Sequence, residues 1–93
     1  MVIGVLQLEL SIGDAMSLKD KRRVIKSLKD RIANNSNVSI AEVGALDSHR
    51  RSILGVAMVG NEKSYVEGGL SKLVDFVRSV GNVDLVDYQI DLL

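Results

Sequence analysis

The 93-residue sequence contains no cysteine and no proline, and only three of its residues are aromatic. The absence of cysteine excludes disulfides, thiolate metal sites, iron–sulfur clusters and cysteine nucleophiles. Because there is also no Gly/Ser-rich linker and no low-complexity segment, the chain offers no place at which to divide it. We therefore expect residues 1–93 to form a single domain.

Long apolar runs are missing as well. Charged residues interrupt each apolar stretch within about ten residues, well short of the ~20 that cross a bilayer. The first ten residues lack the basic leader of a signal peptide and include Glu9. With 46% hydrophobic and 26% charged residues, the composition is typical of a globular protein. We expect a cytoplasmic protein with no membrane partner.

Hydrophobic periodicity predicts strands at residues 1–10, 38–43, 51–59 and 83–92. A first helix begins at Ser17, with Asp20 three residues later in a capping box, and ends in the Asn/Ser run 34–37. A second helix, capped by Asn61, ends at Gly81; its Gly68-Gly69 pair is expected to pack closely against the sheet. The order βαββαβ predicts an α+β fold, the ferredoxin-like sandwich, with a four-stranded antiparallel sheet of order 4-1-3-2 and both helices on one face.

Charge is distributed unevenly although it sums to zero. Residues 17–51 carry nine Lys/Arg against four Asp/Glu, and the remainder carries three against eight. Seven of the twelve basic residues lie in the first predicted helix. Such asymmetry favours an anionic partner.

The predicted topology places the start of the first helix and the loop before the third strand at the same end of the molecule. A helix N-terminus surrounded by basic side chains is suited to phosphate. Lys21 lies near the centre of the helix's apolar stripe, so we expect its chain to extend past the core edge. The candidate anion- or nucleic-acid-binding residues are Lys19, Lys21, Arg22, Arg23, Lys26, His49, Arg50 and Arg51. The alternative is that these side chains only solvate the helix.

The sequence does not predict a catalytic site or a metal site. His49 is the single histidine, and Asp47, Ser48 and Ser52 are its neighbours in sequence, whereas a catalytic triad draws its groups from separately fixed elements. One histidine and scattered carboxylates give no recognisable metal-ligand spacing. We expect no catalytic residue, no metal and no cofactor.

The open face of the predicted sheet carries no aromatic side chain on its two central strands, residues 1–10 and 51–59. RNA-recognition motifs stack bases on aromatics at those positions, so base readout of that kind is excluded. Ile3 and Val5 instead make this face apolar. An apolar open face usually packs against a second protein surface. We expect a homo-oligomer that uses Ile3 and Val5.

Four segments resemble the YlxP-like family of small bacterial proteins of unknown function: 2–10, 17–28 (Ser-Leu-Lys-Asp-Lys-Arg-Arg-Val-Ile-Lys-Ser-Leu), 37–43 (Asn-Val-Ser-Ile-Ala-Glu-Val) and 54–59. The resemblance spans almost the whole chain. It implies a ferredoxin-like fold and genes that neighbour those of translation-initiation and ribosome-maturation factors, ribosome-binding factor A among them. It implies no activity and no catalytic residue.

These features predict a non-enzymatic protein that associates with RNA or the ribosome through its basic end. One alternative is a homo-oligomeric interaction module that binds no nucleic acid. Another is a protein that binds a small phosphorylated compound at the same helix terminus.

Overall fold

The computed structural model describes residues 1–93 and confirms the predicted order of elements. They are β1 (Val2–Ser11), α1 (Leu18–Asn35), β2 (Val38–Gly44), β3 (Arg51–Gly60), α2 (Lys63–Ser79) and β4 (Asp84–Leu92). The predicted cap of the second helix is wrong: Glu62, and not Asn61, is the N-cap, and its side chain makes no capping hydrogen bond.

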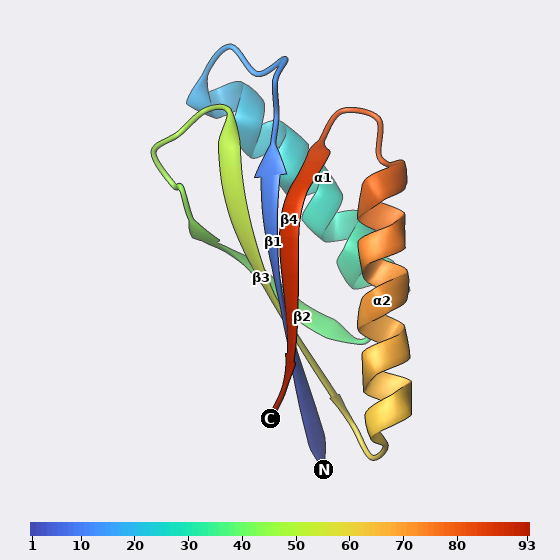
Figure 1. Ribbon diagram of the computed structural model, residues 1–93. Coiled ribbons are helices and arrows are strands. Elements are labelled where there is room, and N and C mark those ends of the chain that lie inside the picture. The colour runs from blue at the N-terminus through green and yellow to red at the C-terminus, as the bar shows by residue number, and fades with distance from the viewer.

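The four strands form one antiparallel sheet in the order β2-β3-β1-β4, which is the predicted order read from the other edge. Both helices cover the same face (Figure 1). The architecture is therefore the ferredoxin-like βαββαβ sandwich. β1 and β3 are its central strands, and β2 and β4 are its edges.

Alternation along the central strands creates the core. Leu6, Leu8 and Leu10 of β1 are fully buried, and every second residue of β3 from Ser52 to Met58 is buried beside them. The apolar stripes of both helices close over these side chains, so that 18 buried residues form a single cluster. The alternate residues of β1 and β3 face away from the helices and leave the other face of the sheet open.

The molecule is elongated, with principal extents of 42 × 21 × 20 Å. The N- and C-termini lie together at one end of the sheet, and the β1–α1 and β2–β3 connections lie together at the other (Figure 1). Neither helix has the length and apolarity that crossing a membrane would require.

Candidate functional site

The first turn of α1 is fixed by local hydrogen bonds. The Ser17 hydroxyl accepts from the Asp20 backbone N–H at 3.1 Å, and the Asp20 carboxylate accepts from the Met16 N–H at 3.0 Å. Ser17 is the N-cap, as predicted. The carboxylate also complements the positive end of the helix dipole. This cap fixes the start of α1, so that Lys19 and the basic residues after it lie in the first turns of the helix.

The β2–β3 loop lies against the β1–α1 connection. The Ile12 N–H donates to the Arg50 carbonyl at 2.9 Å, and the Arg50 Nε donates to the Ala15 carbonyl at 3.4 Å. The prediction that the loop and the start of α1 share one end of the molecule is confirmed. Residues about 30 positions apart in the sequence thus belong to one surface.

Lys21 does not belong to that surface, because its side chain is fully buried. Its ammonium forms an ion pair with Glu42 Oε2 at 3.0 Å. It also donates to the carbonyls of Ala45 at 2.8 Å, Arg51 at 3.1 Å and Leu46 at 3.4 Å. The expectations that Lys21 binds an external anion and that its chain extends past the core edge are both wrong. A buried ammonium requires partners, and the β2–β3 loop supplies them.

The Glu42 carboxylate has a second hydrogen-bond donor, Ser52. The hydroxyl of buried Ser52 donates to Glu42 Oε2 at 2.7 Å, so the carboxylate accepts from both Ser52 and Lys21. No buried side-chain nitrogen or oxygen lacks a hydrogen-bond partner. We call Lys21, Glu42 and Ser52 the lysine lock. It joins α1 to the ends of β2 and β3 from inside the fold.

The loop adopts one unusual backbone conformation next to the lysine lock. Ala45 has a φ of 56°, in the left-handed region that disfavours side chains. The Ala45 carbonyl accepts from Lys21 and also from the Ser48 N–H at 3.1 Å. These bonds compensate for the strain at Ala45 and tie the loop to α1.

The remaining candidate residues are all exposed. We call them the basic end: Lys19, Arg22, Arg23, Lys26, His49, Arg50 and Arg51. Two of them have acidic partners, with Lys26 at 2.7 Å from Asp30 and Arg51 at 3.2 Å from Glu9. The hydrogen bond that Lys26 donates to Asp30, reinforced by the negative charge of that carboxylate, raises the pKa of Lys26.

The other members of the basic end make no ion pair within 4.0 Å. Asp14 and Asp47 are exposed nearby in sequence but form no ion pair with any of them. Lys19, Arg22 and Arg23 can therefore engage an anion without first breaking an ion pair, and Arg50 keeps its terminal guanidinium nitrogens available beside its bond to Ala15. They project from two elements, the first half of α1 and the β2–β3 loop.

The two serines near His49 in sequence form hydrogen bonds with other residues. Ser52 donates to Glu42, and the Ser48 hydroxyl accepts from the Arg51 N–H at 3.2 Å. His49 has no hydrogen bond to either serine. No group of three His, Cys, Asp or Glu side chains lies close enough together to hold a metal ion.

Ile3 and Val5 lie on the open face of the sheet, half-buried, opposite Val59 and Ala57 of β3. Val59 is 49% exposed, and Val43 of β2 is 58% exposed. The open face therefore carries an apolar surface, as the alternation predicted. It lies away from both helices and is separate from the lysine lock.

Comparison with known proteins identifies the family. A family model described as "Protein of unknown function (DUF503)" matches residues 3–90. The chain belongs to this family. It is also 36% identical over 83 residues to "Uncharacterized protein YlxP" of Bacillus subtilis (strain 168), a match that covers 89% of this chain and 90% of that protein. The resemblance to the YlxP-like family is confirmed.

Proposed function

We propose that this chain is a non-enzymatic RNA-binding protein that holds RNA phosphates at its basic end and associates with the ribosome. The observation that carries the proposal is the lysine lock. Its bonds to the Ala45 and Arg51 carbonyls anchor the β2–β3 loop to α1 on both sides of His49 and Arg50, at the end of the molecule where Arg22 and Arg23 lie. A preorganised cluster of cations loses less side-chain and loop freedom on binding than a mobile one.

The charge pattern supports phosphate as the partner. Arg22, Arg23 and Lys19 lie near the N-terminal end of α1, where the helix dipole is positive, and none of them has an acidic partner. Arginine is well matched to phosphate because its planar guanidinium can donate two parallel hydrogen bonds. The resemblance to the YlxP-like family implies genes that neighbour those of translation and ribosome-maturation factors, which favours ribosomal RNA as the partner.

The basic end contacts the backbone of the RNA and does not read its sequence. Neither β1 nor β3 displays an aromatic side chain on which a base could stack. Binding that depends on phosphate contacts has a characteristic salt dependence. The logarithm of the association constant falls against the logarithm of salt concentration with a slope of about −0.7 for each phosphate neutralised on a single strand.

Two charge-matched double variants test the proposal. Arg22→Ala/Arg23→Ala removes two cations from the basic end, and Lys63→Ala/Arg78→Ala removes two from α2. Binding to a fluorescent single-stranded RNA of 20 nucleotides is measured between 50 and 300 mM salt. We expect the first variant to bind about tenfold or more weakly and to reduce the salt slope by about 1.4. The second variant should behave like the unmodified chain.

Equal loss of affinity in both variants would mean that only net charge matters. A binding constant that does not change with salt would also contradict the proposal. Each variant is first checked by circular dichroism, since all four substituted side chains are exposed and should leave the fold intact.

The apolar open face favours a second candidate function, a homo-oligomeric interaction module. Exposed Val59 and Val43 extend the surface that Ile3 and Val5 begin. An apolar face of this kind is commonly covered by a second copy or another protein. Sedimentation at micromolar concentration that shows only monomer would exclude the dimer, and a dimer without RNA affinity would favour this candidate over the first.

A further inference from the structure

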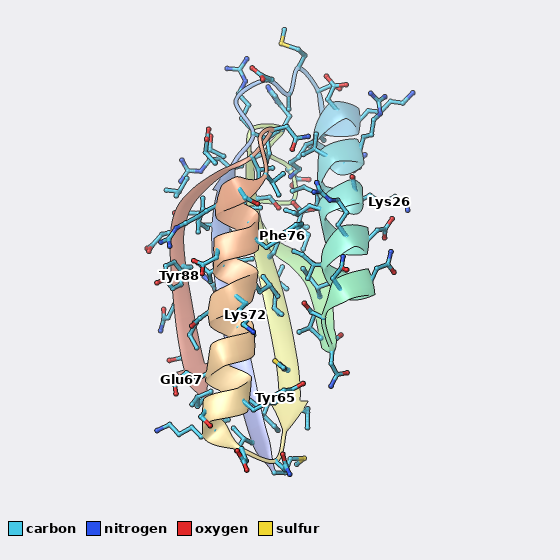
Figure 2. The ribbon with its side chains drawn as sticks, turned by 90° about the vertical axis from the view of Figure 1, so that its right-hand side faces the viewer. Lys26, Tyr65, Glu67, Lys72, Phe76 and Tyr88 are labelled. Carbon is cyan, nitrogen blue, oxygen red and sulfur yellow. The ribbon has the colours of Figure 1, made fainter.

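A groove of about 740 Å³ separates the C-terminal half of α1 from α2. Met58 of β3 lies at its base, and Arg31 and Asn35 line the side formed by α1. Tyr65, Lys72 and Phe76 are spaced along α2, which forms the other side; Figure 2 looks toward this region. From Tyr65 to Phe76 the helix rises about 16 Å. The groove lies at the opposite end of α1 from the basic end.

The charged side chains of the lining are all cationic. Arg31 and Lys72 are its charged residues, and no aspartate or glutamate lines it. Five of its 13 lining residues are hydrophobic and most of the lining surface is apolar, while asparagine and serine side chains supply hydrogen-bonding groups. A lipid tail or the apolar face of a helix would leave these polar groups unpaired. The lining instead suits an anion that also carries hydrogen-bonding edges.

Aromatic rings lie at both ends of the α2 side. The Arg31 guanidinium lies over the Phe76 ring, 5.1 Å from its centroid, so this cation is already held at the groove. Tyr65 lines the groove and is 55% exposed. Base–aromatic stacking needs such a ring and tolerates any base.

The two adjacent glycines of α2 have different surroundings. A Cβ at Gly69 would come within 2.8 Å of the Met58 side chain, so packing explains this glycine, as predicted. A Cβ at Gly68 would meet nothing within 4 Å, and the prediction that Gly68 packs against the sheet is wrong. Glycine in a helix interior is destabilising relative to alanine. Gly68 therefore lowers the stability of α2 and leaves open space in the groove wall.

We propose that the groove binds a nucleotide. Arg31 and Lys72 contact its phosphate, the ring of Tyr65 stacks on its base, and Gly68 leaves the room that the base occupies. The amide of Asn37, which lies between the C-cap of α1 and β2 and lines the groove, offers a donor and an acceptor to the edge of the base. The nucleotide is either free or one unit of a single-stranded RNA; the RNA case rests on the proposed function, and the free-nucleotide case does not.

Matched variants of α2 test the site. Gly68→Leu fills the groove, whereas Ser71→Leu places the same side chain at an exposed position of α2 that does not line it. Binding of adenosine, guanosine, uridine and cytidine 5′-monophosphates is measured by isothermal titration calorimetry. We expect at least one of them, or the single-stranded 20-nucleotide RNA, to bind at least tenfold more weakly to Gly68→Leu than to Ser71→Leu. Lys72→Ala should weaken the same ligand, with Lys63→Ala as its control.

Gly68→Ala adds a second readout. Its methyl group meets no neighbour, so the melting temperature should rise because alanine stabilises the helix. A variant that is more stable yet binds the nucleotide more weakly indicates that Gly68 serves the ligand. Crosslinking of 4-thiouridine RNA should also label the peptide that contains Tyr65.

The outcomes separate the two proposals. If Arg22→Ala/Arg23→Ala abolishes RNA binding while Gly68→Leu and Lys72→Ala change neither probe, the groove proposal fails and the proposed function stands. Binding of mononucleotides that Gly68→Leu weakens, without any affinity for RNA, supports the groove and contradicts the proposed function. If no probe binds, or if Gly68→Leu and Ser71→Leu behave alike, the groove is not a nucleotide site.

Discussion

The two ends of α1 are held in different ways. At the N-terminal end, the Ser17 cap and the ammonium of Lys21 bond the helix to the β1–α1 connection and the β2–β3 loop. At the C-terminal end, the Asn35 side chain bonds back to the Arg31 carbonyl at 2.8 Å, within the helix itself, and a groove separates the helix from α2. One end is locked to its neighbours and the other borders open space.

The difference shows that lysine and arginine residues adjacent in sequence can have unrelated roles. Lys21 faces inward and connects three elements of the fold, whereas Arg22 and Arg23 face solvent without an acidic partner. A count of positive charge along α1 treats them alike. Only the burial of each side chain separates the residue that positions the surface from those that form it.

Removing the lysine lock should have the largest effect. Lys21→Met leaves the Glu42 carboxylate without its ion-pair partner and removes one donor from each of three carbonyls. Breaking a buried ion pair on one side costs about 3–5 kcal/mol. We expect the free energy of unfolding to fall by about 3 kcal/mol or more, measured by urea denaturation.

Lys26→Met is the matched control on the same helix, because Lys26 and Asp30 are both exposed. It should leave the urea midpoint nearly unchanged. If Lys21→Met does not fold, the double variant Lys21→Met/Glu42→Gln should recover part of the lost free energy of unfolding, because it removes the carboxylate charge that has no partner. Similar midpoints for Lys21→Met and Lys26→Met would contradict the distinction between the locked end and the surface.

A smaller effect is expected from the strained loop. Ala45→Gly keeps the carbonyl that Lys21 contacts and relieves a φ of 56°. The strain of about 1–2 kcal/mol exceeds the extra chain entropy of glycine, about 0.5–1 kcal/mol, so a gain of about 0.5 kcal/mol is expected. Calorimetry should show a rise in melting temperature. A fall would mean that the Ala45 methyl group, and not the backbone geometry, holds the loop.

Most of the fold could be predicted from the sequence because its signals are local. The alternation of Leu6, Leu8 and Leu10 defines a strand with one buried face, and Ser17 with Asp20 marks the start of a helix. The handedness of βαβ units then determines the sheet order and places the β2–β3 loop beside α1. These rules need no knowledge of distant contacts.

The lysine lock and the groove could not be predicted in the same way. The sequence shows that Lys21 lies near the centre of the apolar stripe of the helix, but its partners come from β2, the β2–β3 loop and the start of β3. Three of these partners are backbone carbonyls, which carry no residue-type signal. The groove depends on how far the C-terminal half of α1 lies from α2. The glycine pair was the one available signal, and it does not reveal which glycine faces the sheet.

The basic end is the proposed site of contact with RNA. The most direct test is a two-dimensional NMR titration of the ¹⁵N-labelled chain with a single-stranded RNA of 20 nucleotides at low salt. Backbone resonances of residues 18–26 and 47–51 are predicted to shift most, and the shifts should disappear as salt is raised. Shifts confined to the open face around Ile3, Val5 and Val59, or no shifts at all, would contradict the account.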